Sequence, residues 1–316
     1  MLTDSRLRAQ VDLLWDKLWT GGLTNPLDSI EQLSFLVFLK RLDDVENSRE
    51  RGARLRQQTY QPRIPAELRW SHWTHFKAED ALKHVREKVF PWLREMGNTG
   101  SSFELYMGSA EFKINKANLL IEACKLIDQM HISDQNQDVQ GDLYEYLLGR
   151  LSTAGLNGQF RTPRHIIRMM VEMIDPRPNE RIGDLAAGTA GFLVNAYQHI
   201  LEQHTPPESL TCDAEGWPHN MTGELLTEEQ YKFLQTQAFR GYDNDSGMTM
   251  LRIGSMNLML HGIESPHFYH MDTLSKEFKE TQEYDVILMN PPFKGAVDKA
   301  DISSTLPSTT TKSELL

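Results

Sequence analysis

The feature that most constrains the fold is a change in hydrophobic pattern partway along the 316-residue chain. From about residue 164 onward, short apolar strands alternate with helices. This alternation is typical of a wound α/β sheet, in which each helix returns the chain to the next strand. We therefore predict strands at Arg181–Ala186, Phe239–Asp243, His267–His270 and Tyr284–Met289, and helices at Arg164–Ile174, Gly191–Gln203 and Met248–His261.

The residues before this change carry helical periodicity. Apolar side chains recur at helical spacing from Leu7 to Leu42, with an interruption at Gly21-Gly22. Asn25-Pro26 reads as a turn, and Ser29–Gln32 has the spacing of a capping box, so we expect a second helix to begin there.

Further along, the polar stretch from Asp43 to Arg63 indicates an exposed helix end and loop. Trp70, Trp73 and Phe76 are predicted to be packing aromatics rather than a surface for stacking bases. Two more helices are expected at Leu82–Leu93 and Leu119–Met130. The polar segment His131–Gln140 then divides the chain into an all-helical N-terminal domain, residues 1–135, and an α/β domain, residues 136–316.

Composition limits the classes of partner and compartment. The net charge of −11 is unlike that of a protein that grips DNA phosphates alone, so any basic surface must be local or supplied by a partner. No apolar run reaches the ~18–20 residues that cross a bilayer, and the N-terminus lacks the apolar block of a signal peptide. The only cysteines, Cys124 and Cys212, are far apart and lack metal-ligand spacing. These features predict a cytoplasmic protein without a metal site or membrane association.

A strand, a turn of small residues and a helix start follow one another from Ile182 to Phe192. Small side chains there let a ligand approach the backbone and the N–H groups at the helix N-terminus. The dinucleotide pattern G-x-G-x-x-G and the phosphate-binding pattern G-K-[ST] are both absent. The candidate binding residues of this segment are Asp184, Gly188, Thr189, Ala190 and Gly191.

Acidic residues follow the next two expected strands. Asp243 ends the second strand, where a carboxylate can accept hydrogen bonds from both hydroxyls of a ribose, and Asp245 is the second choice. Asp272 follows the third strand and is a candidate acceptor for an adenine amino group, with an ordinary acidic turn as an equally good interpretation.

The sequence Asn290-Pro291-Pro292-Phe293 directly follows the fourth expected strand. The two prolines cannot continue the strand, so they form a rigid turn that presents the Asn290 side chain at the edge of the sheet. The amide oxygen and a nearby backbone carbonyl are suitable acceptors for the N–H bonds of an exocyclic amino group, and Phe293 offers a flat surface for stacking a base. This set of groups predicts methyl transfer to an amino nitrogen.

Together these motifs resemble the modification subunit of type I restriction–modification systems, within the amino-group DNA methyltransferases. The resemblance covers nearly the whole chain and implies a Rossmann-like, S-adenosylmethionine-dependent methyltransferase sheet behind a helical domain. It also implies that Asn290, Pro291, Pro292 and Phe293 are catalytic and that Asp243 binds the cofactor ribose. The segment upstream of the glycine turn would line the methionine end of the cofactor, through Gln159, Phe160, Arg161, Thr162, Pro163 and Arg164.

The resemblance implies methylation of adenine N6 in DNA, with a specificity subunit and a restriction subunit as partners. Two departures are visible: Ala190 stands where the commonest pattern has a glycine, and family members continue past Leu316, so we expect a C-terminally incomplete catalytic domain. The segment Met256–Ile263 is interpreted as a packing helix. Two alternatives stay open: an RNA base or a protein glutamine as methyl acceptor, and a non-catalytic fragment that binds a specificity subunit.

Overall fold

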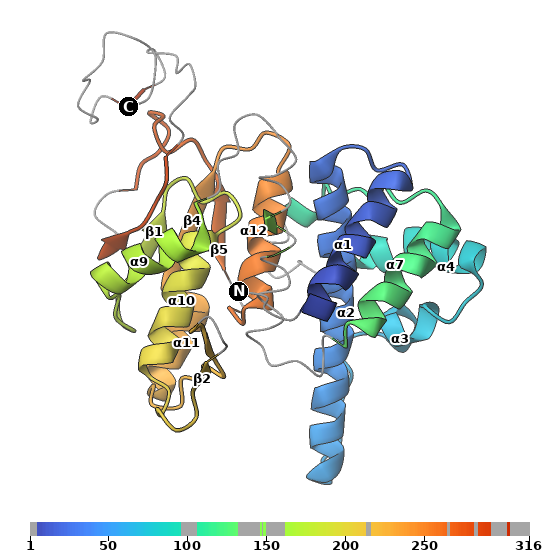
Figure 1. The fold of residues 1–316 in the computed structure, drawn as a ribbon, viewed down its shortest axis with the longest axis horizontal. Coiled ribbons are helices and arrows are strands. Elements are labelled where there is room, and N and C mark those ends of the chain that lie inside the picture. The colour runs from blue at the N-terminus through green and yellow to red at the C-terminus, as the bar shows by residue number, and fades with distance from the viewer. Residues whose placement is uncertain are drawn as a thin grey trace. The chain divides into compact units, whose positions relative to one another are not determined.

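The chain forms two compact units, residues 1–100 with 104–148, and residues 101–103 with 149–316. The computed structural model describes residues 5–95, 106–131, 146, 148–149, 162–212, 216–263, 266–280, 284–291 and 302–303. Figure 1 shows the helices of the first unit and the sheet of the second. Among the described residues, none of the helices combines the length and the apolar character that crossing a bilayer requires.

The first unit is helical in all its described elements, as the sequence predicts. The α-helices are α1 Ser5–Thr20, α2 Pro26–Leu55, α3 Trp70–Trp73, α4 Ala78–His84, α5 Phe90–Glu95 and α7 Ala117–Gln129. A short 3-10 turn, η1 Ala66–Leu68, precedes α3, and a π-helical turn, η2 Val85–Val89, joins α4 to α5.

Helix α2 begins earlier than the sequence suggests. Asn25 is its N-cap, because the side-chain oxygen accepts a hydrogen bond from the Leu27 N–H at 3.0 Å, and Pro26 occupies the first turn. The expected capping box at Ser29 is therefore wrong. Ser29 lies inside the helix, buried, and its hydroxyl donates to the Leu23 carbonyl at 2.8 Å.

The same helix ends at Leu55, within the polar stretch where a helix end was expected, but two acidic residues of that stretch are buried. Asp43 and Glu46 are only 2% and 1% exposed. The Arg69 Nε donates to Asp43 at 2.7 Å, and the Arg63 backbone N–H donates to Glu46 at 2.6 Å. The expected exposed helix end and loop are confirmed for the exposed residues from Ser48 to Arg63, but Asp43 and Glu46 are exceptions, because the chain that folds back beside α2 buries them.

The aromatic side chains near α3 pack in the core, as predicted. Trp70 and Trp73 are 3% and 0% exposed, with their rings 5.1 Å apart. The Trp70 indole N–H donates to Asp128 of α7 at 2.8 Å, which satisfies the one polar group of the ring. Phe76 is half-buried.

The second unit contains a four-stranded sheet in the order β5-β4-β1-β6, with every neighbouring pair parallel. The strands are β1 Ile182–Asp184, β4 Phe239–Asp243, β5 His267–His270 and β6 Val286–Ile287. The expected bounds of β4 and β5 are confirmed. The strands β1 and β6 are shorter than expected, because a turn begins directly after Asp184 and only two residues of β6 pair with β1.

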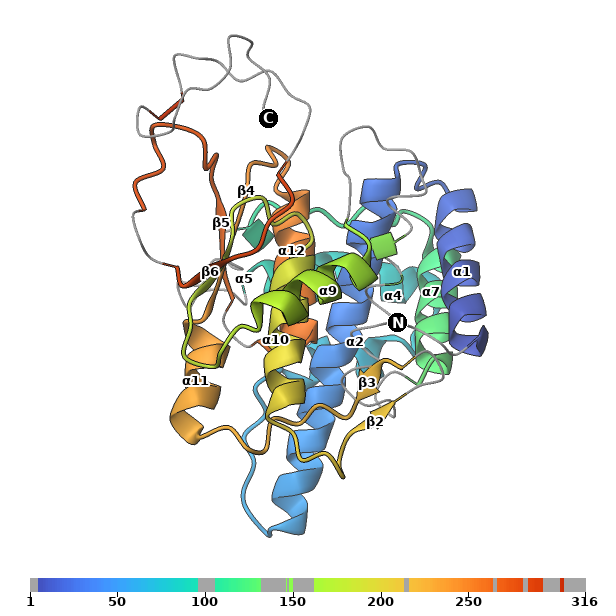
Figure 2. The same ribbon diagram turned by 60° about the vertical axis from the view of Figure 1, so that its left-hand side comes forward.

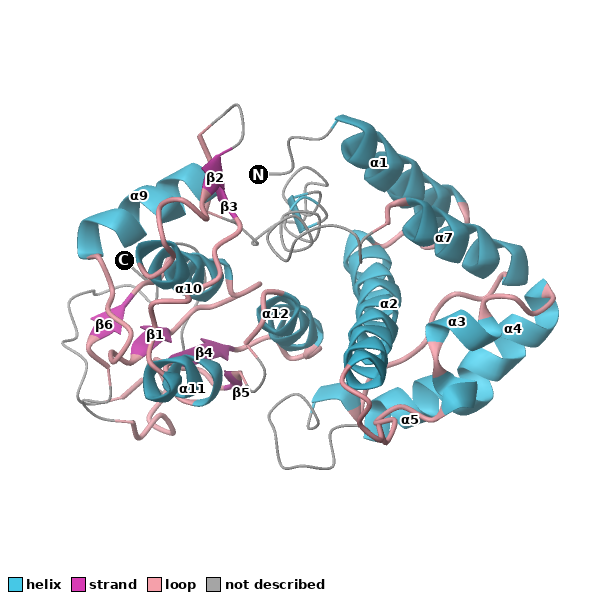
Figure 3. Cartoon of the chain, turned by 90° about the horizontal axis from the view of Figure 1, so that it is seen from below, coloured by secondary structure: helices cyan, strands magenta, loops and turns pink. Residues whose placement is uncertain are grey.

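Three helices pack beside this sheet: α9 Arg164–Ile174, α10 Gly191–Gln203 and α12 Thr249–Leu260. Viewed with the strands nearly end-on, α9 and α10 lie together on one side of the strand row, and α12 lies near its β5 end (Figure 3). Every residue of α10 from Gly191 to Leu201 is buried, as a helix between a sheet and another helix requires. The predicted wound α/β sheet behind a helical domain is confirmed.

Between α10 and β4 the chain forms a hairpin and one more helix. Strands β2 Thr211–Cys212 and β3 Pro218–His219 pair antiparallel, and α11 Glu228–Thr236 starts with a capping box at Thr227 and Gln230. The Gln235 amide of α11 donates to the Tyr197 hydroxyl of α10 at 2.8 Å, so this insertion is tied to the core.

The buried ion pair on α2 gives a prediction about stability. Arg69→Ala leaves the buried Asp43 carboxylate without its cation, so we expect the free energy of unfolding to fall by about 3–5 kcal/mol. Urea denaturation measures this change. Lys17→Ala is the matched control, because the Lys17–Glu122 pair is exposed and its loss is expected to have little effect. Equal effects of the two substitutions would contradict the prediction.

Candidate active site

The strand order identifies where a ligand can bind. From β1 the chain moves outward through β4 to β5 and then returns to β6 on the other side of β1. In open parallel sheets the crevice at such a change of direction, at the carboxyl ends of the strands, is the usual ligand site. The glycine turn follows β1 and Asn290 follows β6, so both lie at the carboxyl ends of the two strands that flank this crevice.

The glycine turn between β1 and α10 is open and conformationally unusual. Gly188 has φ +51°, and a Cβ built there would have no atom within 4 Å, so the backbone faces free space. Ala190 is the N-cap of α10 and has φ +64°. The left-handed conformation that would make alanine costly at this position is therefore present, at a cost of about 1–2 kcal/mol.

Asp243 is bound directly to this turn. One carboxylate oxygen accepts the Gly188 backbone N–H at 2.9 Å, and the other accepts the Asp245 N–H at 2.9 Å. Burial raises the pKa of Asp243, and the nearby Asp245 charge adds to the increase, whereas the bond from Gly188 opposes it. The structure thus brings two predicted cofactor residues, from different strands, into contact.

Asp245, the second choice for a ribose acceptor, binds backbone N–H groups at the start of α12. Its two oxygens accept the Gly247 and Met250 backbone N–H groups at 3.2 and 2.9 Å, so the side chain caps the start of α12. Asp272 is half-buried, and its side chain accepts the Leu274 N–H at 3.0 Å within its own turn.

Asp184 lies beneath the turn and is 1% exposed. Its carboxyl group accepts the Ala186 N–H at 3.1 Å. Burial raises the pKa of Asp184 to about 8, and the negative charge of Asp243 contributes to the increase. Two carboxyl groups with raised pKa values therefore lie beside the glycine turn.

A residue of α12 that the sequence analysis treated as packing also supports the turn. The side-chain amide of Asn257 donates to the Thr189 carbonyl at 2.8 Å, and Asn257 is fully buried. On the same helix, a Cβ on Gly254 would lie 3.0 Å from the Gly188 carbonyl. The signal in the sequence was an asparagine within the apolar run Met256–Leu260, because a buried amide needs partners.

Asn290 is half-buried and Pro291 is exposed, so the asparagine is neither enclosed in the core nor fully in solvent. The preceding Leu288 is 3% exposed, and its N–H donates to the Gly183 carbonyl at 3.0 Å. This bond fixes the chain before Asn290 beside β1. Pro292 and Phe293 lie outside the described residues.

The predicted methionine-binding segment is only partly described: Gln159, Phe160 and Arg161 lie outside the described residues. Thr162 is half-buried, and Pro163 is exposed at the N-cap of α9. The Arg164 guanidinium donates to Gln198 at 3.1 Å and lies 4.8 Å from the centre of the Trp217 ring. Gln198 is seven residues along α10 from Gly191, so the Arg164 guanidinium contacts this helix about 10 Å from its start.

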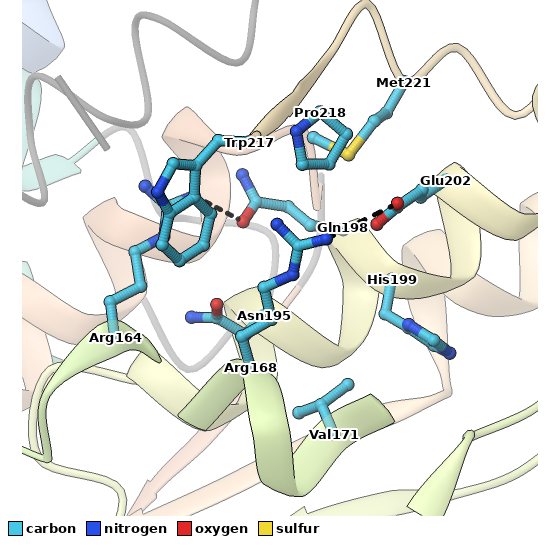
Figure 4. Close-up of a pocket in the computed structure, with 10 residues that line it drawn as sticks. All are labelled: Arg164, Arg168, Val171, Asn195, Gln198, His199, Glu202, Trp217, Pro218 and Met221. Atoms are coloured by element: carbon cyan, nitrogen blue, oxygen red, sulfur yellow. Dashed lines mark hydrogen bonds and ion pairs between the residues drawn. The ribbon is translucent and has the colours of Figure 1, made fainter. Parts of the chain in front are cut away.

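Arg164 lines a shallow pocket formed by α9, α10 and the hairpin, in which Trp217 lies over both arginines of α9 (Figure 4). Arg168 is 4.9 Å from the same ring, and its side chain also pairs with Glu172 and Glu202. Arg164 and Arg168 each have partners within the protein. We therefore interpret this pocket as a packing contact between the hairpin and α9 rather than as a second ligand site.

Within the described part of the chain, no group of three or more His, Cys, Asp or Glu side chains is placed to hold a metal ion. Cys124 is buried and Cys212 is exposed.

The raised pKa of Asp184 predicts a pH dependence of stability. Between the ordinary carboxyl pKa of about 4 and about 8, the folded protein retains a proton that the unfolded chain has lost. The free energy of unfolding should therefore fall as the pH rises through this window, by up to about 1.4 kcal/mol per unit.

Asp184→Asn removes this titration and keeps an oxygen acceptor for Ala186. Urea denaturation at pH 5, 6.5 and 8 should show the variant gaining stability relative to the original protein as the pH rises. Asp285→Asn, at an exposed carboxylate, is the control. A constant difference between Asp184→Asn and the original protein at all three pH values would refute the assignment.

Solved structures share this fold over nearly the whole chain. A type I modification subunit from Vibrio vulnificus superposes with a TM-score of 0.73 at 27% identity, covering 99% of this chain and 66% of that one. A chain from a structural study of type I restriction–modification assembly gives a TM-score of 0.68 at 26% identity, covering 99% of this chain and 60% of the other.

Curated relatives show the same likeness in sequence. The methylase subunit of the type I restriction enzyme EcoEI from Escherichia coli is 30% identical over 87% of this chain and 53% of its own length. The EcoKI methylase subunit, from E. coli K12, is 29% identical over 99% of this chain and 55% of its own length. The chain therefore spans about half the length of these relatives.

Two family models match in succession. Residues 7–127 match the HsdM N-terminal domain, and residues 135–307 match the N-6 DNA Methylase family. The second match covers more than half of the chain and contains the glycine turn, Asp243 and Asn290. The chain belongs to the N-6 DNA methylase family, with the helical domain of the type I restriction–modification methylase subunit in front.

Proposed function

We propose that the protein transfers a methyl group from S-adenosylmethionine to the N6 amino group of adenine in DNA, as the modification subunit of a type I complex. The observation that carries this proposal is the bond between Asp243 and Gly188 at the end of β1, beside the strand that leads to Asn290. This bond joins the Asp243 carboxylate, which can accept hydrogen bonds from a ribose, to the open turn at Gly188. The Asn290 amide, which is suited to bind an amino group, follows the neighbouring strand β6.

The residues at the turn fit the cofactor. Free space at Gly188 allows a ligand to approach the backbone, and α10 begins three residues later at Gly191, where the N–H groups of a helix start are suited to a ligand. Each oxygen of Asp243 has one N–H partner given by the structure and a second lone pair, which suits a ribose diol. When bound, S-adenosylmethionine supplies an electrophilic methyl group.

Asn290 would act on the nucleophile. An amino nitrogen conjugated with a purine ring has little basicity, because its lone pair is delocalised into the ring. The Asn290 amide oxygen, accepting one N–H, favours the tetrahedral nitrogen that carries positive charge during methyl transfer. The target adenine has to leave the duplex stack to reach this position, and Phe293 is proposed to stack against it.

The proposed partners follow from the family. A specificity subunit would read the DNA sequence and a restriction subunit would carry out cleavage, as components of the same complex. An RNA base or a protein glutamine is the alternative methyl acceptor, and methylation assays with DNA, RNA and protein acceptors separate these substrates.

A substitution at Asn290 tests the chemical step. Asn290→Ala should lower the rate of labelled methyl transfer to DNA by about 100-fold or more, because one acceptor that acts on the transition state is lost. Binding of S-adenosylmethionine, measured by calorimetry, should be unchanged. Asn179→Ala is the control, since Asn179 is an exposed asparagine before β1, at the opposite end of the sheet. Full activity of Asn290→Ala would refute the proposal. No S-adenosylmethionine binding by the original protein, together with stable association with a specificity subunit, would support a non-catalytic module.

A substitution at Asp243 tests the cofactor site. Asp243→Asn should raise the Kd for S-adenosylhomocysteine about tenfold, because a charged acceptor of the ribose hydroxyls is lost. The original protein should bind the 2′-deoxyribose analogue more weakly than S-adenosylhomocysteine, whereas the variant should hardly distinguish the two. Asp285→Asn, at the amino end of β6, should behave like the original protein. A variant that distinguishes the analogues as well as the original does would assign the ribose contact elsewhere.

A further inference from the structure

The C-terminal end of α2 carries a concentrated positive charge. Arg49, Arg51, Arg54 and Arg56 lie within eight residues, and all four side chains are exposed. This part of α2 extends beyond the other helices of the first unit (Figures 1 and 2). These four residues form what we call the α2 arginine cluster.

The acidic residues of the same helix neutralise this cluster only in part. Asp43 and Glu46 are buried, and they accept hydrogen bonds from the Arg69 side chain and the Arg63 backbone. Glu50 is paired with Arg69 at 3.2 Å and lies 3.9 Å from Arg54. The negative charge is therefore directed toward the body of the unit, and the positive charge toward solvent.

The arginines occupy two sides of the exposed helix. Arg51 and Arg54 are three residues apart and share one side of α2, and Arg49 lies on another side. Arg56 is the C-cap residue, and its Nε donates to the Gly52 carbonyl at 3.1 Å. Two small residues, Ser48 and Gly52, leave the helix narrow next to these arginines. A narrow helix edged by guanidinium groups can approach the major groove of B-DNA and reach the phosphates on both sides.

The overall charge means that phosphate contacts from this chain have to come from a local basic surface. A net charge of −11 repels DNA, so binding requires a region where cations displace the counterions of the phosphates. All four residues are arginines, whose planar groups donate two hydrogen bonds to one phosphate, and none is lysine.

We propose that the α2 arginine cluster binds the phosphates of duplex DNA and is the local basic surface through which this acidic protein holds its substrate. The choice of DNA as partner rests on the proposed function, whereas the exposed charge and its arrangement do not depend on it.

The test replaces all four arginines, as Arg49→Gln/Arg51→Gln/Arg54→Gln/Arg56→Gln. Glutamine is a good helix former, so α2 should persist, which circular dichroism and thermal unfolding verify. Duplex binding by the intact protein is measured by fluorescence anisotropy over a series of salt concentrations. Each lost phosphate contact reduces the salt slope by about 0.9. We expect a slope smaller by about 2–4 and an affinity at least about tenfold weaker at 0.1 M salt.

The matched control is Lys83→Gln/Lys88→Gln, which removes exposed positive charge from the segment 78–95 of the same unit. This control should change the DNA affinity by less than about a third of the effect of the quadruple variant. The reason is that the proposal places neither Lys83 nor Lys88 against a DNA phosphate. An unchanged slope in the quadruple variant, or no duplex binding by the original protein, overturns the proposal. Loss of association with a protein subunit at an unchanged DNA slope would also overturn it and identify an acidic protein as the partner.

The DNA-binding and methyl-transfer assays together separate this inference from the proposed function. If the cluster is needed for duplex binding but the original protein transfers no methyl group, only the proposed function fails. If methyl transfer depends on Asn290 but duplex binding does not depend on the cluster, only this inference fails.

Discussion

The hydrogen bond from the Gly188 backbone to Asp243 is the constraint on which the second unit depends. It joins the turn after β1 to the end of β4, so the two neighbouring strands end at one fixed point. The turn is further held by Asn257 of α12 through the Thr189 carbonyl. A left-handed Ala190 is tolerated because these contacts determine the backbone around it.

The electrostatics of this region follow from burial. Asp184 and Asp243 lie on either side of the same turn, and burial raises the pKa of both. The surroundings of the turn therefore disfavour the charged form of both carboxyl groups. A cationic ligand near Asp184 and Asp243 would favour the ionised form of these carboxyl groups. Binding of such a ligand would therefore be linked to their protonation.

The helical unit uses charge in a different way. Asp43 and Glu46 are buried side chains of α2. Asp43 accepts a hydrogen bond from the Arg69 side chain, and Glu46 accepts one from the Arg63 backbone N–H. Because the acidic residues are used internally, the arginines beyond them are left exposed. A single helix therefore combines a buried ionic contact that stabilises the unit with a basic end that can meet another molecule.

The sequence by itself determined the alternation of strands and helices, the exact bounds of β4, β5, α9 and α10, and the family motifs around Asn290. These features depend on local periodicity and on turn residues, which neighbouring positions in the chain specify. Only the tertiary structure decided that Asp43 of α2 is buried, that Ala190 is left-handed, that Asp245 caps α12 and that Asn257 supports the glycine turn. The burial of Asp43 and the bond from Asn257 depend on partners more than 12 residues away, and the Ala190 conformation is set by packing. The Asp245 cap is local, but it is made by side-chain hydrogen bonds, which hydrophobic spacing does not indicate.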